Sequence, residues 1–176
     1  MKDILEKAKN IKVVIFDIDG VLTDGSLFIG DDGQEYKAFN SRDGHGLKML
    51  QNNGVLVAII TGRTSEVVKH RIRDLGIKHV YQGQHDKTIA FRDLLETLDI
   101  SAEECAYVGD DVVDLPVMSQ VGLAIAVQDA HHMVLKHSHW QTPSNGGRGA
   151  GRDVCEMIME AQGTLESELN SYLHKP

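Results

Sequence analysis

The stretch KVVIFDIDGVLTD, residues 12–24, decides the fold of the chain. Residues 12–16 form a short apolar, β-branched run bounded by polar residues, which predicts a buried strand. Asp17 and Asp19 follow directly, where that strand ends. Ligands of open α/β sheets bind outside the carboxyl ends of the strands. Two acids placed there repel each other unless a cation or a shared proton intervenes, so the stretch predicts a site for a hard metal such as Mg²⁺.

Length and composition predict an ordinary globular protein. The 176 residues, 41% hydrophobic and 25% charged, indicate one domain spanning 1–176. A net charge of −8 without a basic patch argues against a nucleic-acid partner. Cys105 and Cys155 are too few for a disulfide framework and predict reduced thiols in a cytoplasmic protein. The polar first ten residues lack an apolar signal core, and no apolar run approaches membrane-spanning length, so we expect no membrane partner.

Further along the chain, apolar strand-like runs alternate with helical patterns. Strands are predicted at residues 12–16, 55–60, 79–81, 105–108, 123–127 and 139–141. Helices are predicted at residues 3–9, 43–53, 65–75, 86–98, 113–120, 130–137 and 152–162, the third capped by Thr64 or Ser65. The helix at 86–98 is expected to offer the core Ile89, Phe91, Leu94, Leu95 and Leu98. This alternation predicts an α/β fold with a doubly wound, Rossmann-like parallel sheet.

Residues 25–39 interrupt the first crossover of this predicted sheet. They look like two short strands around an Asp-Gly turn, and a hairpin of this size is too short to be a separate cap domain. Its apolar side chains need cover, which either a partner subunit or the hairpin's own domain can supply. These side chains are Leu27, Phe28, Ile29 and Phe39.

Polar residues follow three of the predicted buried strands. They are Asp17 with Asp19, Thr61 with Gly62, and Asp110 with Asp111 and Asp114. A parallel sheet gathers its strand ends at one edge, and Lys87 opens a helix between the last two sets. Taken singly, each is ordinary, because acids are common in turns and a helix-opening lysine is usually solvated. Their common position after apolar strands favours one functional site.

Each member of this set has a role in phosphoryl transfer. As a carboxylate, Asp17 can attack phosphorus, and Asp19 can protonate the leaving alcohol and then activate water. A hydroxyl from Thr61 and the amide of Gly62 can bind phosphate, while Lys87 supplies positive charge to the transferring oxygens. A magnesium ion completes the site.

In that site Asp110 joins Asp17 as a ligand of Mg²⁺, which offsets the repulsion between nucleophile and phosphate. Asp111 and Asp114 are equally compatible with helix capping and with a surface position.

The same residues resemble the four motifs of the haloacid dehalogenase superfamily. The motifs are DIDGVLTD at 17–24, TGR at 61–63, Lys87, and GDD-x-x-D at 109–114. The second acid, Asp19, is similar to that of the phosphatase branch, where it speeds hydrolysis of an aspartyl phosphate. The resemblance also implies that the metal takes the backbone carbonyl of Asp19.

Within the superfamily, the chain is similar to the 3-deoxy-D-manno-octulosonate 8-phosphate phosphatase family. The short hairpin and four further stretches carry the likeness, namely FNSRDG at 39–44, YQGQ at 81–84, AYVGDD at 106–111 and GGRGA at 146–150. The family implies a cytoplasmic homotetramer that makes a sugar of the lipopolysaccharide inner core. Its hairpins associate across subunits, and its glycine-rich segment and C-terminal tail, here 146–176, reach a neighbour's active site. Arg148 is therefore expected to contact substrate in trans, while 169–176 receive no role.

The implied substrate carries a phosphate and a carboxylate on a long polyol. Arginine forms bidentate pairs with carboxylates, so Arg63 and Arg71 are candidates for binding the substrate carboxylate. The alternative for both is a solvated helix face. The roles of Arg42, His45 and His85 stay open, although Mg²⁺ prefers oxygen ligands to histidine.

Three other functions compete with this interpretation. One is a phosphatase for a nine-carbon acid sugar phosphate. Another is a phospho-accepting receiver domain, but receivers place their lysine last, whereas Lys87 precedes the Gly-Asp-Asp set. The third is a non-catalytic scaffold, which the intact acids oppose.

Overall fold

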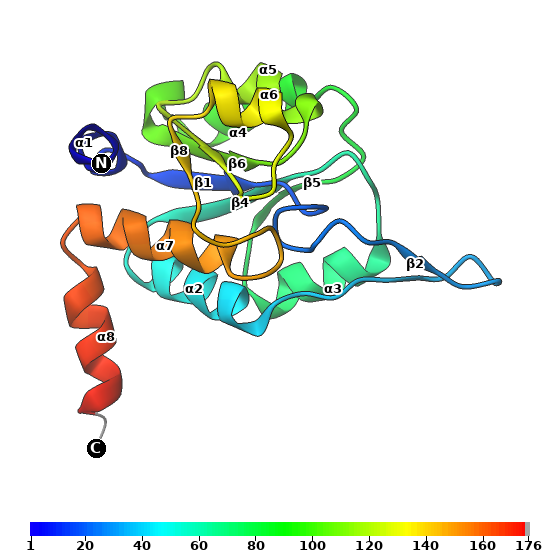
Figure 1. Cartoon of the computed structure of the whole chain (residues 1–176), viewed down its shortest axis with the longest axis horizontal. Coiled ribbons are helices and arrows are strands. Elements are labelled where there is room, and N and C mark those ends of the chain that lie inside the picture. Colours follow the sequence, from blue (N-terminus) through cyan, green and yellow to red (C-terminus); the bar gives the residue numbers. More distant parts are fainter. Residues whose placement is uncertain (175–176) are drawn as a thin grey trace.

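The computed structural model describes residues 1–174 and centres on a six-stranded sheet (Figure 1). The strand order is β5-β4-β1-β6-β7-β8, and every pairing is parallel. The strands are β1 (Val13–Phe16), β4 (Leu56–Ile60), β5 (His79–Tyr81), β6 (Cys105–Gly109), β7 (Leu123–Ala126) and β8 (Trp140–Gln141). All four residues of β1 are fully buried, because helices cover both faces of a parallel sheet. The predicted doubly wound sheet is confirmed.

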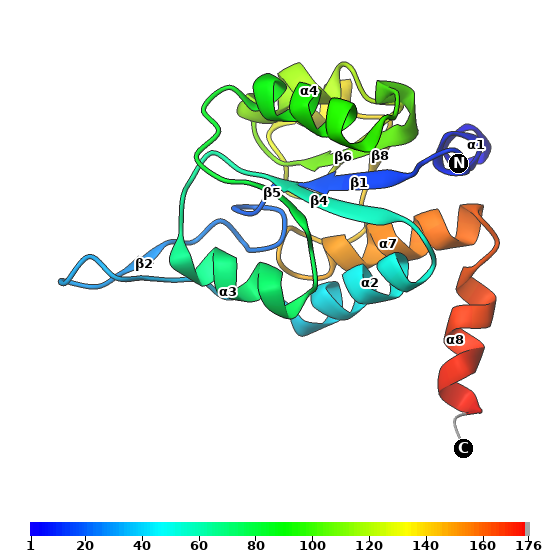
Figure 2. The ribbon, with the colours of Figure 1, turned by 180° about the vertical axis from the view of Figure 1, so that it is seen from behind.

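Helices form a layer on each side of this sheet (Figures 1 and 2). One layer holds α2 (Ser41–Asn52), α3 (Glu66–Asp74) and α7 (Ala150–Ala161), and the other holds α4 (Lys87–Leu98), α5 (Leu115–Met118) and α6 (His132–His137). The first helix, α1 (Lys2–Ala8), contacts α7, and α8 (Leu165–Leu173) projects away from the body. Two 3₁₀ turns, η1 (Ala102–Glu104) and η2 (Val112–Asp114), flank β6.

The strand order fixes where a ligand can bind. From β1 the chain adds β4 and β5 on one side, and it then returns to place β6, β7 and β8 on the other side of β1. The connections that leave β1 and β6 therefore run to opposite faces, toward α2 and toward η2 and α5. Such a switch point opens a crevice at the carboxyl ends of the strands. Asp17 and Asp110 follow β1 and β6 directly.

The predicted hairpin insertion is present as β2 (Phe28–Ile29) paired antiparallel with β3 (Glu35–Tyr36). It projects from the body in both views (Figures 1 and 2). Leu27, Phe28, Ile29 and Tyr36 are exposed, so within this chain the hairpin does not fold back to cover its apolar side chains. Phe39 differs from the expectation, because it is half-buried against the core.

The expected inward position of Ile89 on α4 is wrong, since 62% of this residue is exposed. The reason is that Lys87, at the start of the helix, turns inward and is only 3% exposed. At about 100° per residue, Ala90, Phe91 and Leu94 share the face of Lys87, whereas Ile89 lies on the opposite face. The inward position of Lys87 therefore determines which face of α4 packs against the core.

Smaller differences concern helix ends. The helix expected at 113–120 is shorter, because η2 precedes a four-residue α5. Ser65 precedes α3, but its side chain makes no capping hydrogen bond. The tail predicted from 164 forms α8 up to Leu173, and its last two residues, 175–176, lie outside the described residues.

Candidate active site

Residues from the ends of β1, β4 and β6 meet in a pocket of about 250 Å³. Its lining includes seven of the predicted site residues, Asp17, Asp19, Thr61, Gly62, Arg63, Lys87 and Asp110. Gln84, His85, Asp111 and Val113 complete it. Because β1 lies between β4 and β6, Asp17 is the central member of this group. The sheet thus brings together residues that are far apart in the sequence.

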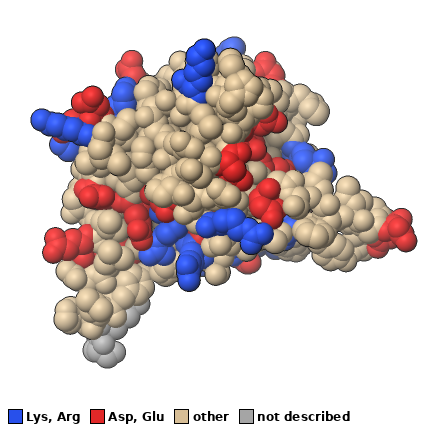
Figure 3. Space-filling model, in the orientation of Figure 1, with Lys and Arg blue, Asp and Glu red and all other residues tan. Residues whose placement is uncertain are grey.

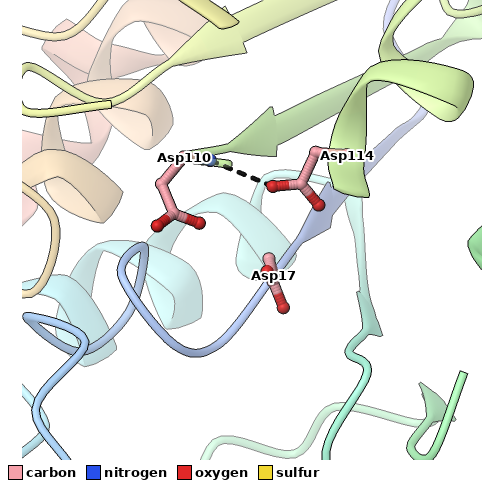
Figure 4. A group of neighbouring side chains, drawn as sticks. All are labelled: Asp17, Asp110 and Asp114. Carbon is pink, nitrogen blue, oxygen red and sulfur yellow. Dashed lines mark hydrogen bonds between the residues drawn. The ribbon is translucent and has the colours of Figure 1, made fainter. Parts of the chain in front are cut away.

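Three acids lie close together where β1 and β6 end (Figure 4), and two of them, Asp17 and Asp110, line the pocket. Asp17, Asp110 and Asp114 each offer one carboxylate oxygen, and these oxygens lie within 4.8 Å of one another. The first and second of these acids were predicted as metal ligands, and the third was not.

Asp114 is held by hydrogen bonds on both of its carboxylate oxygens and does not offer a free ligand. Its Oδ1 accepts hydrogen bonds from Lys87 Nζ and the hydroxyl of Tyr107, each at 2.7 Å. Its Oδ2 accepts from the backbone N–H groups of Asp110 at 3.0 Å and of Asp111 at 3.3 Å. Both oxygens are therefore occupied, and the residue is completely buried. The surface position considered for Asp114 is wrong.

The remaining two acids fit a divalent cation. Asp110 Oδ1 is buried and has no hydrogen-bond partner among the described residues. Burial, followed by repulsion from Asp114 and Asp17, raises the pKa of Asp110 to about 8. Burial and the same Asp114 charge raise the pKa of Asp17 to about 6, although Lys87 opposes the shift. Asp110 therefore lacks a cationic partner among the described residues, and Asp17 has only Lys87, so a hard cation would compensate both carboxylates.

The backbone carbonyl of Asp19 is also available to a metal, since it accepts no hydrogen bond from any described residue.

Lys87 connects α4 to Asp17 and Asp114. Its Nζ lies 2.9 Å from Asp17 Oδ2 and 2.7 Å from Asp114 Oδ1, and the side chain is buried. Burial alone lowers the pKa of this amine, but the two carboxylates outweigh it and raise the pKa above its usual value. Asp86 caps α4 by accepting from the N–H of Thr88 at 3.0 Å, which fixes the start of the helix. Lys87 is thus a buried cation beside the candidate nucleophile, not a solvated helix residue.

The loop after β1 passes too close to Asp110 for a side chain. Gly20 has φ +88°, and a Cβ there would lie 2.0 Å from Asp110 Oδ2. Behind the loop lies the glycine-rich segment, whose Gly147 N–H donates to the carbonyl of Val21 at 2.8 Å. A Cβ on Gly147 would lie 2.2 Å from the carbonyl carbon of Thr23. In this chain the glycine-rich segment is therefore a brace for the loop that carries Asp19.

Arg148 lies at the end of this brace. Its Nη2 is 3.1 Å from Asp24 Oδ2, and 69% of its side chain is exposed.

Sequence reasoning missed two charged residues that pair with residues lining the pocket, Lys37 and Glu35. Lys37 Nζ forms an ion pair with Asp19 Oδ1, and Arg63 Nη2 lies 2.8 Å from Glu35 Oε1. Both come from β3 or the residue that follows it, and no spacing rule relates them to the acids after β1. The sequence pattern of the hairpin singled out only its apolar residues.

The predicted arginines separate in the structure. Arg63 lines the pocket, but Arg71 does not. Arg71 Nη2 donates to the carbonyl of Asn40 at 3.3 Å, and the Arg71 guanidinium lies 5.8 Å from the centre of the Phe39 ring. Of the histidines left open, His85 lines the pocket, and His45 packs edge-on against Tyr172.

Acidic and basic side chains alternate over the face shown in Figure 3, without an extended basic surface. Among the described helices, none combines the length and the apolar character that crossing a bilayer requires.

Comparisons with known proteins show which family the chain belongs to. Residues 79–151 match the family model of haloacid dehalogenase-like hydrolases. The 3-deoxy-D-manno-octulosonate 8-phosphate phosphatase of Escherichia coli K12 is 51% identical over 164 residues, which cover 93% of this chain and 87% of that protein.

Two solved structures extend the likeness to three dimensions. The Yersinia pestis 3-deoxy-D-manno-octulosonate 8-phosphate phosphatase has a TM-score of 0.92 and 49% identity, over 93% of this chain and 89% of that one. The Moraxella catarrhalis enzyme, solved with a magnesium ion, a phosphate ion and the sugar acid, has a TM-score of 0.96 and 41% identity, over 98% and 99%. The chain is a phosphomonoesterase of the 3-deoxy-D-manno-octulosonate 8-phosphate phosphatase family, within the haloacid dehalogenase-like hydrolases.

Proposed function

We propose that this protein hydrolyses 3-deoxy-D-manno-octulosonate 8-phosphate to the free sugar acid and phosphate, as a step of lipopolysaccharide biosynthesis, through a phosphorylated Asp17. The observation that carries the proposal is the pair of acids, buried Asp17 and half-buried Asp110, beside the buried amine of Lys87. A phosphate entering the pocket meets a carboxylate, a cation and an incomplete metal site together.

Two carboxylates divide the chemistry. An oxygen of Asp17 attacks phosphorus, the bond from phosphorus to the sugar oxygen breaks, and Asp19 gives its proton to that oxygen. A water molecule then attacks phosphorus and gives a proton to Asp19, and the bond from phosphorus to Asp17 breaks. Phosphate leaves, and both carboxylates return to their starting state.

The other pocket residues bind and orient the phosphate. The hydroxyl of Thr61 and the N–H of Gly62 follow β4 and line the pocket, and Lys87 places its ammonium beside Asp17. Asp17, Asp110 and the backbone carbonyl of Asp19 would hold Mg²⁺, which supplies charge neutralisation between the nucleophile and the phosphate.

Arg63 is the best-placed residue for the substrate carboxylate, because it lines the pocket and its guanidinium forms a fork suited to a carboxylate. The same chemistry serves a nine-carbon acid sugar phosphate. The ratio of kcat/KM for the eight-carbon and nine-carbon phosphates separates the two, and a preference for the nine-carbon compound would overturn the substrate given above.

We further propose that the protein is a cytoplasmic homotetramer whose neighbouring subunits close the active site. The exposed apolar side chains of the hairpin support this, since burial against another copy removes them from water. Within that assembly Arg148 reaches a neighbour's substrate, exchanging its exposed pair with Asp24 for the ligand. A monomer by mass in solution at micromolar concentration would contradict this arrangement.

The deciding experiment is phosphate release from acid-sugar phosphates, with and without Mg²⁺. We expect release only with the metal, and none with Asp17→Asn. The matched control is Asp31→Asn, which changes an exposed acid in the hairpin turn and should leave the rate intact. Phosphorylation without turnover would indicate a receiver domain, and no reaction with any phosphate would indicate a scaffold.

A further inference from the structure

Lys37 is a buried lysine that the mechanism above does not use. It follows β3 at the base of the hairpin, and its side chain has 0% exposure. Its Nζ forms an ion pair with Asp19 Oδ1 and lies 3.4 Å from Glu35 Oε1. An ammonium ion is removed from water only where carboxylates compensate it, so these two acids fix where the amine can lie.

Asp19 is held on one side only. Lys37 occupies Oδ1, whereas Oδ2 makes no hydrogen bond with any described residue. About a fifth of the Asp19 side chain is exposed, and Asp19 lines the pocket. The pairing therefore restrains the carboxylate while leaving one oxygen for a proton or a water molecule.

The second acid, Glu35, is itself anchored. Arg63 Nη2 donates to Glu35 Oε1 at 2.8 Å. Partial burial acts to raise the pKa of Glu35, but hydrogen bonds from Arg63 and Ser65 outweigh it and lower that pKa, so Glu35 carries a charge at neutral pH. The result is a chain of alternating charges, Arg63–Glu35–Lys37–Asp19, that runs from the loop after β4 through the hairpin to the loop after β1.

We propose that Lys37 is a positioning residue that holds Asp19 for proton transfer, with Glu35 holding Lys37. This inference rests on the proposed function, because it assigns Asp19 the proton-transfer role. Proton-transfer partners must lie within hydrogen-bond reach of the reacting oxygen, and an unrestrained aspartate spends less time there. Asp17, Asp110 and Lys87 are held by separate contacts, so phosphate binding and attack do not depend on Lys37.

This separation predicts an unusual kinetic pattern for Lys37→Met, which keeps the length of the side chain and removes the charge. With p-nitrophenyl phosphate, the leaving phenolate needs little protonation, so transfer to Asp17 stays fast while hydrolysis of the phosphorylated enzyme slows. We expect kcat to fall about 100-fold, the size of one acid–base contribution, while kcat/KM stays within about threefold of the wild-type value. A burst of about one phenolate per site should precede the slow turnover.

With the sugar phosphate, whose alcohol does need the proton, we expect kcat/KM to fall about 100-fold. Lys37→Arg should recover part of both rates, and Glu35→Gln should give a weaker form of the same pattern. Lys69→Met is the matched control, since it removes a lysine from an exposed Lys–Glu pair on α3 and should change none of these quantities.

Equal losses of kcat/KM on the two substrates, without a burst, would overturn the proposal, because a purely structural lesion reduces the amount of competent site for both. A Lys37→Met enzyme with wild-type rates would also overturn it. The proposed function fails separately, through a wild-type enzyme that releases no phosphate from the sugar phosphate. In that case the burst with p-nitrophenyl phosphate still decides the role of Lys37.

Discussion

Lys87 and Lys37 are both buried lysines that pair with acids of the same pocket, but they reach it from very different parts of the molecule. Lys87 begins a twelve-residue helix and is locked between Asp17 and Asp114. Lys37 follows a two-residue strand of a hairpin that projects from the body. The proposed nucleophile, Asp17, is therefore fixed by the core of one chain, whereas the proposed proton-transferring acid, Asp19, is held by a short insertion.

This contrast has a functional consequence. A hairpin with exposed apolar side chains is the part of the chain most sensitive to a neighbouring subunit. In the proposed assembly, such a neighbour would act on Asp19 through Lys37 and leave Asp17 untouched. The proposals thus connect assembly with proton transfer and assign metal binding to the core.

The largest effect should come from Asp110→Asn, which removes one of the two candidate carboxylate ligands of the metal. We expect kcat to fall by about 10³ or more, and the Mg²⁺ concentration for half-maximal activity to rise, because an amide is a weaker ligand for a hard cation. A Mg²⁺ titration of activity measures both quantities. The control is Asp111→Asn, an exposed neighbour whose side chain caps η2, and equal effects of the two variants would show that the metal is not held by Asp110.

The second variant tests the core side of the contrast. Asp114→Asn leaves Lys87 with one carboxylate and replaces one of the two acceptor oxygens of residue 114 with an NH2 donor, which then faces other donors. Breaking a buried ion pair costs about 3–5 kcal/mol, so we expect this much loss in the free energy of unfolding, measured by urea denaturation. Glu66→Gln, which breaks an exposed pair with Lys69, should change stability little. Similar denaturation midpoints for the two variants would place Asp114 outside the stabilising network.

The brace behind the loop gives the next test. Gly147 and Gly76 both have positive φ, +67° and +69°, but a Cβ on Gly76 meets nothing within 4 Å. Alanine at either position therefore carries the same backbone strain, about 1 kcal/mol. Gly147→Ala also displaces the backbone at Thr23, so we expect kcat to fall about tenfold beyond any loss in Gly76→Ala. Equal activity per folded molecule in the two variants would mean that the brace does not position the loop.

Much of the site could be predicted because most of its residues directly follow apolar runs in the sequence. Apolar runs followed by acids mark strand ends, and a parallel sheet collects strand ends at one edge, so Asp17, Thr61 and Asp110 were expected together. The position of Asp114 followed no such rule, because its burial depends on Lys87 turning inward from another element. The same turn exposes Ile89, which helical periodicity alone assigned to the core.

The contacts of the hairpin were beyond sequence reasoning for a related reason. Lys37 and Asp19 are 18 residues apart, and their pairing depends on the path of a loop rather than on a repeat. Arg71 shows the converse, since its place on α3 suggested the pocket, whereas its guanidinium packs on Phe39 and the start of α2.

Asp17 and Asp110, the two candidate carboxylate ligands of the metal, should also titrate at an unusual pH. An ordinary aspartate titrates near about 3.9 when unfolded, whereas Asp17 and Asp110 have pKa values of about 6 and about 8. Both groups therefore bind protons more tightly in the folded, metal-free protein. The free energy of unfolding falls as the pH rises from about 4 to about 8, because ionisation is opposed only in the folded state.

Mg²⁺ competes with those protons, so it should bind at least about a hundredfold more tightly at about pH 8 than at about pH 5.5. At saturating metal this difference raises the melting temperature by about 5–10 °C more at the higher pH. Differential scanning calorimetry with and without Mg²⁺ measures it, and Asp110→Asn should remove most of the pH dependence. Lys37→Met should preserve that dependence, because Lys37 pairs with the carboxylate of Asp19 and with neither Asp17 nor Asp110. A loss of the metal response in Lys37→Met would instead place the hairpin lysine in the metal site and end the division between core and insertion.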